Sequence, residues 1–251
     1  MTHVVNANFG TKVRFVSDFD DELRLLENYI RTQSSDGSPI QILEAGCGRE
    51  WYFRLAGFSY ELTGLDLDAA ALEARRSIKG DMIRSFVGDV RDADLPKGHF
   101  DVIYSAFVLE HVEGAELALT NFVRWLKPGG ILIVRVPDRN SVQGFLTRFT
   151  PHWFHVVYYR WAWKMRDAGK SGFGPYRTVY DPIVSQKGLE QFCAKHALTI
   201  VEILGVGTYR RGYGIARRIT PIVATVVSAL TFGRVHNRFV DLTIIARKQT
   251  S

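Results

Sequence analysis

The sequence has few cysteines and no long apolar run. Its 251 residues include two cysteines, Cys47 and Cys193, which lie far apart in the chain. Two isolated thiols give neither a disulfide framework nor a zinc-binding spacing, so we expect a reducing compartment and no metal site. No stretch reaches the roughly 18 apolar residues of a membrane-spanning helix. The first residues, MTHVVNANFGTK, also lack the apolar core of a signal peptide. These absences predict a cytoplasmic protein.

Acidic residues are scarce in two segments. Between 139 and 180, seven lysines or arginines accompany one acid, Asp167, and between 205 and 238, six arginines accompany none. Each segment carries +6, which equals the net charge of the whole chain, so the remainder carries −6. Both segments are also aromatic or apolar. They suggest anionic partners such as lipid headgroups, phosphorylated substrates or nucleic acid, while an ordinary solvated surface explains them equally well.

Hydrophobic residues make up 46% of the chain and recur in short runs. The runs predict strands at 40–45, 61–65, 82–87, 101–105, 131–136, 199–206 and 239–246. Helical patterns predict helices at 19–32, 51–56, 69–78, 116–126 and 185–196. This alternation favours an α/β fold with a parallel sheet covered on both faces. We expect one domain over 1–251, interrupted by insertions at 137–182 and 207–238.

The most informative motif is a glycine-paired turn between two predicted strands. Residues 42–50 read ILEAGCGRE, and Asp66 follows Gly46 by twenty positions. A strand, a tight loop and a later acid are how α/β proteins hold an adenosine. A dinucleotide loop needs a third glycine where this chain has Trp51. Glu44, just ahead of the loop, would repel a diphosphate and attract an ammonium or sulfonium, which favours S-adenosylmethionine over NAD.

The motifs together resemble those of the class I S-adenosylmethionine-dependent methyltransferases, in the broad branch that includes the ubiquinone-biosynthesis type. The stretches that carry the resemblance are ILEAGCGRE, LTGLDLD, VGDVRDADLP, FDVIYSAFVLEHV and LKPGGILIVRVP. The resemblance covers 40–136 well and 185–246 loosely. It implies a Rossmann-like, doubly wound sheet of seven mostly parallel strands, with the last strand antiparallel and helices on both faces.

The resemblance also implies roles for individual residues. It places the methionine part of the cofactor against Glu44, Gly46, Cys47 and Gly48. It places the ribose hydroxyls against Asp66, with Leu67 beside the adenine, and the adenine amino group against Asp89, with Val90 next to it. The sulfonium side would lie against Ala106, Phe107 and His111. Alternatively, Asp66 and Asp89 are turn or cap residues, and Cys47 fills space in the turn. Glu50 departs from the pattern, because the family usually has a glycine there.

Candidates for the acceptor side are few. His111 follows a strand at its carboxyl end, where α/β sites lie, and is either a catalytic base or a histidine hydrogen-bonded at the start of a helix. His152, His155 and Tyr176 fall in the first insertion. They either face the acceptor or belong to an aromatic packing stripe.

The second insertion contains a predicted helix at 217–232, in which Pro221 suits a first helical turn. Its apolar face predicts a lid over the site, a helix in a membrane interface, or packing against the core or a partner copy. We therefore expect a small-molecule or lipid-like acceptor and a peripheral position at an anionic membrane. Alternatives are an RNA or other macromolecule methyltransferase and a catalytically idle, cofactor-binding partner subunit. The acidic body and the lack of an RNA-binding module argue against nucleic acid.

Overall fold

The computed structural model describes residues 12–34, 37–170, 174–179, 181–207, 209 and 214–250. Its strands are β1 Val13–Val16, β2 Ile40–Ala45, β3 Tyr60–Asp66, β4 Arg84–Val87, β5 Phe100–Ala106, β6 Leu126–Pro137, β7 Leu198–Val206 and β8 Asp241–Lys248. Its helices are α1 Phe19–Arg31, α2 Ala69–Ile78, the short 3-10 turn η1 Leu109–His111, α3 Ala115–Trp125, α4 Val142–Phe149, α5 His152–Ala162, α6 Gln186–Lys195 and α7 Ala216–Leu230.

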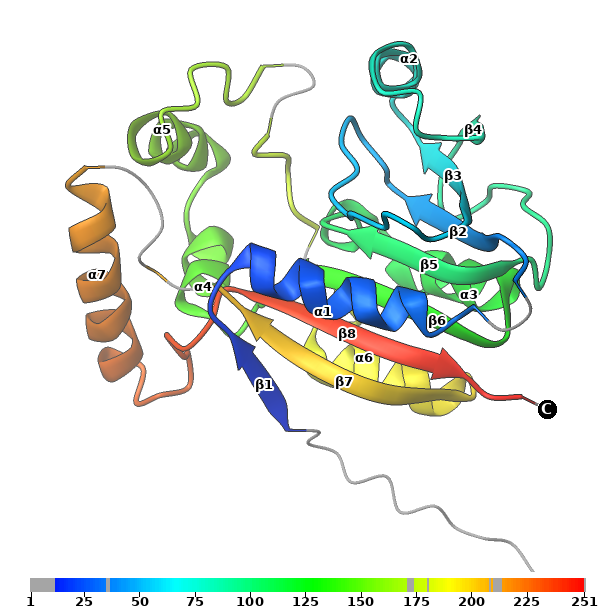
Figure 1. The fold of residues 1–251 in the computed structure, drawn as a ribbon. Coiled ribbons are helices and arrows are strands. Elements are labelled where there is room, and N and C mark those ends of the chain that lie inside the picture. The colour runs from blue at the N-terminus through cyan, green and yellow to red at the C-terminus, as the bar shows by residue number, and fades with distance from the viewer. Residues whose placement is uncertain are drawn as a thin grey trace, which may run out of the picture.

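In these residues the strands form one sheet in the order β1-β7-β8-β6-β5-β2-β3-β4 (Figure 1). Only β8 runs antiparallel to its neighbours β6 and β7, as predicted for the last strand. The sheet has one more strand than expected, because β1 pairs with β7 in parallel. Strand β6 begins at Leu126 and so includes the Pro-Gly-Gly stretch between the helix predicted at 116–126 and the strand predicted at 131–136.

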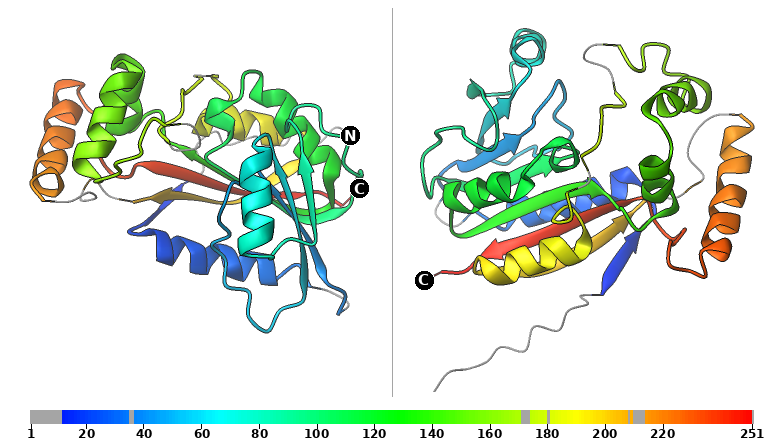
Figure 2. Two further views of the ribbon diagram at one scale, coloured as in Figure 1. Left: turned by 90° about the horizontal axis from the view of Figure 1, so that it is seen from above. Right: turned by 180° about the vertical axis from the view of Figure 1, so that it is seen from behind.

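Helices cover both faces of the sheet, as the run of apolar strands predicts. Helix α1 lies on one face, and α3 and α6 lie on the other (Figures 1 and 2). Neighbouring residues of β2 belong to different buried clusters. Ile42 lies in the cluster that includes Leu26 of α1, whereas Leu43 lies in the cluster that includes Phe122 of α3. A strand buried on both sides needs apolar residues at consecutive positions, which is the pattern of β2.

The short helix predicted at 51–56 does not form, and that prediction was wrong. The segment is extended, and its side chains alternate between core and solvent: Phe53 and Leu55 are buried, while Tyr52 and Arg54 are exposed. Such a period of two is typical of extended chain. Helix α1 holds the segment in place, because Glu27 accepts a hydrogen bond from the Arg54 backbone N–H at 2.5 Å.

The two predicted insertions contribute three helices among the described residues. Helices α4 and α5 follow β6, and α7 follows β7. Helix α7 starts at Ala216, so Pro221 is its sixth residue rather than part of the first turn, and that prediction was wrong. A proline there removes one helical hydrogen bond but leaves the helix intact. None of the described helices is long and apolar enough to cross a membrane.

Candidate functional site

The glycine turn after β2 is closed on one side and open on the other. Gly46 and Gly48 both have positive φ, at 76° and 51°, which glycine adopts without strain. The Gly46 N–H donates to the Leu65 carbonyl at 2.7 Å and so ties the turn to β3. A Cβ on Gly46 would overlap the Val108 side chain, whereas one on Gly48 would meet nothing within 4 Å. The open side at Gly48 leaves room for a ligand against bare backbone.

Asp66 joins this turn to the end of β3. Its carboxylate accepts hydrogen bonds from the Gly48 N–H at 2.7 Å and from the Asp68 N–H at 2.9 Å. These two bonds fix the acid beside the turn and leave further lone pairs on both oxygens. Leu67 follows with 69% of its surface exposed. The end of β3 therefore presents an oriented carboxylate next to an uncovered apolar side chain.

Asp89 follows β4 and is engaged by Arg91. The Arg91 guanidinium donates to both carboxylate oxygens, with the shortest distance 2.6 Å. These hydrogen bonds lower the pKa of Asp89. The neighbouring Val90 is buried in the core. Any ligand that binds Asp89 must share its oxygens with Arg91, an interaction that the sequence analysis missed.

A buried ion-pair network lies beneath the glycine turn, centred on Arg75 of α2. The Arg75 guanidinium is 2.7 Å from the Glu44 carboxylate, donates to the Cys47 carbonyl at 2.8 Å, and donates to both Asp81 oxygens at 3.1 and 3.0 Å. Its side chain is fully buried. Burial raises the pKa of Glu44, and the Arg75 charge opposes that rise. Glu44 is therefore engaged by the protein, and its contact with a ligand stays a prediction.

Sequence analysis missed Arg75, although a signal was available. Arg75 continues the buried face of α2 formed by Ala71 and Leu72, with the spacing of a helical stripe. A cation on a buried stripe requires an anionic partner. The Cys47 thiol is also buried, and burial raises its pKa to about 12, so the thiol stays protonated.

The end of β5 lies against the glycine turn. Ala106 ends the strand, and Phe107 adopts a positive φ of 57°, which is uncommon for a non-glycine residue. The Phe107 ring lies over the Arg135 guanidinium, 4.6 Å from its centre, and is 40% exposed. Val108 then contacts the turn at Gly46. The structure thus brings together the turn and the β5 residues that the sequence analysis selected.

His111 lies in η1 and contacts the returning end of the first insertion. Its Nδ1 is 2.7 Å from the Arg177 carbonyl oxygen, and its ring packs edge-on against Tyr176, with centroids 5.8 Å apart. Its Nε2 is 3.8 Å from the carboxylate of Glu110. Glu110 is buried, and its Oε2 has no hydrogen-bond partner among the residues that the structure describes. Burial raises the pKa of Glu110 to about 8, a feature that no sequence pattern indicated.

The other acceptor-side candidates are placed differently. His152 Nε2 is 2.9 Å from the Pro175 carbonyl oxygen, so His152 contacts the segment that carries Tyr176. His155 instead bonds to the Thr150 hydroxyl at 2.7 Å, within its own part of the chain. Tyr176 is thus the candidate that reaches His111 directly. The carboxylate of Glu50 forms an exposed ion pair with Lys79, 3.3 Å from its Nζ. The described residues contain no cluster of three or more potential metal ligands.

Comparison with known proteins places this geometry in a family. The family described as "Methyltransferase domain" matches residues 43–134, which span the glycine turn, Asp66, Asp89 and His111. The chain contains a class I S-adenosylmethionine-dependent methyltransferase domain.

Relatives of this methyltransferase domain are distant. A ubiquinone biosynthesis O-methyltransferase of Rickettsia typhi is 27% identical over 119 residues, which cover 45% of this chain and 47% of that protein. Phosphoethanolamine N-methyltransferase 3 of Arabidopsis thaliana is 29% identical over 100 residues, which cover 38% of this chain and 20% of that protein. The chain therefore spans less than half the length of these two relatives.

A solved S-adenosylmethionine-dependent methyltransferase from Mesorhizobium loti shares the fold with this domain. It superimposes with a TM-score of 0.52 at 17% identity, covering 88% of this chain and 96% of that one. The family's methyl donor is S-adenosylmethionine. The residues of this chain fit that ligand: the backbone is open at Gly48, Asp66 keeps free lone pairs, and Leu67 and Phe107 present exposed apolar surface.

Proposed function

We propose that this protein transfers the methyl group of S-adenosylmethionine to a small-molecule or lipid-like acceptor. The observation that carries the proposal is the glycine turn fastened to Asp66, with an open side at Gly48. In this arrangement Asp66 would hold the ribose, and the backbone of Gly46 and Gly48 would lie along the methionine part. Asp89 would bind the adenine amino group, with Leu67 and Val90 beside the ring and Cys47, Ala106 and Phe107 lining the remaining wall.

When bound, S-adenosylmethionine supplies a methyl group on a positively charged sulfonium, so the donor is already activated. The protein mainly has to align donor and acceptor, and such positioning contributes roughly 7–11 kcal/mol. A base is needed only for acceptors that lose a proton near the transition state. We assign that role to His111.

The hydrogen bond of His111 determines which of its nitrogens can accept a proton. A carbonyl oxygen only accepts, so Nδ1 carries the hydrogen that it donates to the Arg177 carbonyl, and the neutral ring leaves Nε2 with a free lone pair. Burial lowers the pKa of His111 below its ordinary value of 6.5. The imidazole is therefore neutral at pH 7, which is the state that a base requires. Nε2 would take the proton of the acceptor as the acceptor atom bonds to the methyl group and the methyl–sulfur bond breaks, with S-adenosylhomocysteine as the leaving group.

The first insertion supplies the second part of the proposed acceptor site. The Val179 N–H donates to the Glu110 carbonyl at 2.6 Å, and Arg177 bonds to His111, so residues 177–179 run along η1. Tyr176 then covers His111. We propose that the insertions at 137–182 and 207–238 form a cap on the acceptor side. The names of the relatives support a small acceptor, since those proteins act in ubiquinone biosynthesis and on phosphoethanolamine.

Calorimetric titration with S-adenosylhomocysteine tests the binding half of this proposal. The wild-type protein should bind, and Asp66→Asn should weaken binding about tenfold or more, since it removes a charged acceptor of hydrogen bonds. Asp20→Asn makes the same charge change on an exposed residue of α1 and should bind like the wild type. Absence of binding by the wild type would overturn the proposal.

A methyl-release assay tests the catalytic half. Protein and labelled S-adenosylmethionine are incubated with a cell extract separated into small-molecule, lipid and nucleic-acid fractions. Label should enter the small-molecule or lipid fraction. Label in RNA would favour the macromolecule alternative, and tight S-adenosylhomocysteine binding without label in any fraction would favour an idle partner subunit.

A further inference from the structure

Helix α7 turns most of its large apolar side chains toward solvent and buries two alanines against the protein. Ala216 and Ala224 are buried, and Ala224 packs with Val142 of α4 and Val235. The exposed positions follow a spacing of three or four residues and form one stripe: Ile219, Ile222, Val223, Val226 and Leu230, each 42–74% exposed. A helix that only covered its own domain would bury these side chains instead. The stripe therefore faces a further apolar environment.

A second exposed apolar stripe lies on the neighbouring helix α5. Trp153, Val157 and Trp161 are spaced by four residues and are 54–65% exposed. Helix α7 lies below α5 in the view of Figure 1, and the Tyr158 and Thr220 hydroxyls of the two helices meet at 3.4 Å. Tryptophan is enriched where proteins meet the headgroup layer of a bilayer. Both insertions thus bring apolar helices to the same part of the molecule.

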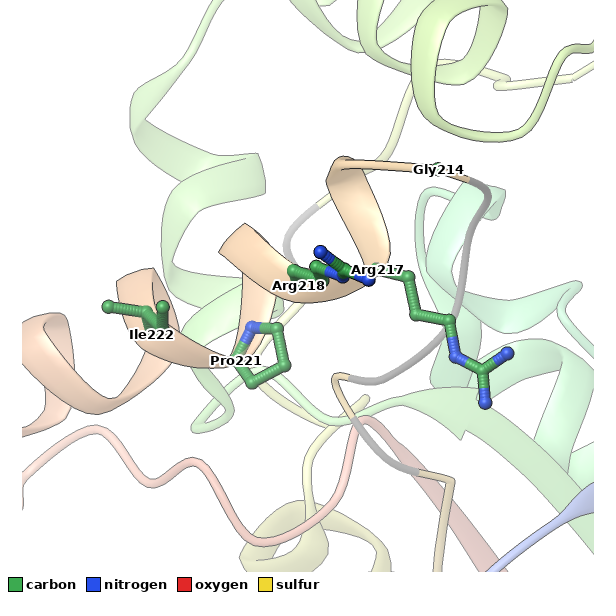
Figure 3. Close-up of a pocket in the computed structure, with 5 residues that line it drawn as sticks. All are labelled: Gly214, Arg217, Arg218, Pro221 and Ile222. Atoms are coloured by element: carbon green, nitrogen blue, oxygen red, sulfur yellow. The ribbon is translucent and has the colours of Figure 1, made fainter.

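Cations border the α7 stripe at both ends. Arg217 and Arg218 lie in the first turn, and Arg234 and Arg238 follow the helix; all four are exposed. Figure 3 shows Arg217 and Arg218 beside Pro221 and Ile222, where they line a pocket with Gly214. Within the described part of the chain, neither of these two arginines forms an ion pair. This pocket includes no predicted cofactor or catalytic residue, so it is separate from the site around Asp66.

We propose that the α7 stripe and its arginines dock onto an anionic lipid bilayer, with α7 lying in the plane of the headgroup layer. A helix of 15 residues is about 22 Å long, which is too short for the roughly 30 Å hydrocarbon core. Apolar residues along one side and arginines at the ends match the chemistry of an in-plane helix on anionic lipid. This inference concerns a surface and stands whether or not the proposed methyl transfer is correct.

Charge complementarity favours lipid over a second copy of the chain. A two-fold dimer through this face would set the same patch against itself. Because arginines border both ends of α7, every antiparallel or parallel arrangement would bring cations together, and residues 205–238 contain no acid to pair with them. An anionic bilayer pairs with all four arginines at once.

Sedimentation with vesicles tests the proposal on the full-length protein. Vesicles of phosphatidylcholine with one quarter phosphatidylglycerol should bind it, and vesicles of phosphatidylcholine alone should bind it much more weakly. The double variant Ile222→Asp/Val226→Asp should lose about tenfold or more in binding, because it places charge within the stripe. Arg217→Ala/Arg218→Ala should lose roughly fivefold per arginine on the anionic vesicles. Both changes fall on exposed positions, so the fold should persist.

Ile78→Asp is the matched control, since Ile78 is 78% exposed on α2, a different helix, and should bind vesicles like the wild type. S-adenosylhomocysteine binding, measured by calorimetry on the same variants, separates a failure of this proposal from a failure of the proposed function. Vesicle binding that is absent in the wild type, or unchanged in the α7 double variant, would refute membrane docking. Sedimentation velocity showing a dimer that the α7 double variant dissociates would assign the stripe to self-association instead.

Discussion

Single residues at this site depend on partners that the sequence motifs do not name. Glu44 was selected as an acid that attracts the cofactor, and the structure pairs it with Arg75, 31 positions later. Asp89 was selected for the adenine, and Arg91 occupies its oxygens. In both cases the residue type was predictable from the motif, while its partner was not, because partners are set by the packing of α2 and the turn after β4.

Replacing Arg75 with methionine should destabilise the protein by about 3 kcal/mol, since it leaves Glu44 and Asp81 without their cation. It should also weaken S-adenosylhomocysteine binding, because Arg75 holds the Cys47 carbonyl of the turn. Urea unfolding and calorimetry measure both effects. The neighbouring Arg76→Met is the control: its pair with Glu73 is exposed, so the loss should stay below about 1 kcal/mol. Equal losses in the two variants would contradict a structural role for the buried network.

His111→Ala should lower turnover about 10²- to 10⁴-fold if the acceptor needs a base, while S-adenosylhomocysteine binding remains near that of the wild type. The pH dependence of turnover also tests whether His111 is the base. Because burial lowers the pKa of His111, wild-type turnover should stay constant through neutral pH and fall only as the pH drops below 6.5 and the ring becomes protonated. Turnover measured from pH 5 to 8 checks this, and an acid limb retained in His111→Ala would assign the titration to another group.

At the scale of elements, the alternation of strands and helices could be predicted well from the sequence. The prediction failed where a segment fits both the helical period and the period of two of extended chain. Most strands and helices were placed to within a few residues, because buried parallel strands and capped helices leave strong local patterns. Asp68, for example, caps the N-terminus of α2. The helix predicted at 51–56 was wrong because the segment is too short for a helical pattern to be distinguished from an alternating one. Its residues WYFRLA alternate with a period of two, and that signal was available.

The extended form of this segment makes a specific prediction. Phe53 packs edge-on against Tyr104 with centroids 4.8 Å apart and is 5% exposed, whereas Tyr52 is 51% exposed. Phe53→Ala should therefore destabilise the protein by about 3–5 kcal/mol. Tyr52→Ala, the adjacent control, should cost clearly less. Urea unfolding of both variants measures the difference, and similar losses would mean that the two side chains do not alternate between core and solvent.

On the scale of the whole molecule, the two proposals assign cofactor binding to the acidic body and the acceptor and membrane surfaces to the two basic insertions. The sheet and its covering helices carry the turn, Asp66 and η1, and they could be predicted from local patterns. The insertions carry Tyr176 and the α7 stripe, and their charge was visible in the sequence while the direction of each face was not. Whether an apolar helix turns inward or outward depends on what it packs against, here the small residues that meet α4.

Buried acids also make the stability of the whole fold depend on pH. Burial raises the pKa of Glu110 to about 8, so the folded state holds a proton that the unfolded state releases near pH 4.5. The free energy of unfolding should therefore fall as the pH rises between these values, by up to about 1.4 kcal/mol per pH unit from this group. His111 acts in the opposite direction below pH 6.5, because its lowered pKa lets the unfolded state bind more protons.

Glu110→Gln isolates the contribution of the acid, since the amide has nearly the same shape and no titration. Subtracting the unfolding free energy of Glu110→Gln from that of the wild type at each pH cancels the contributions that the histidines and the exposed carboxylates make in both proteins. The difference should decline steadily from pH 5 to 8, with Glu110→Gln becoming the more stable protein, relative to wild type, at the alkaline end. Urea unfolding at half-unit pH steps measures the curve. A flat difference would show that the carboxyl group of Glu110 is as well solvated in the folded protein as in the unfolded chain.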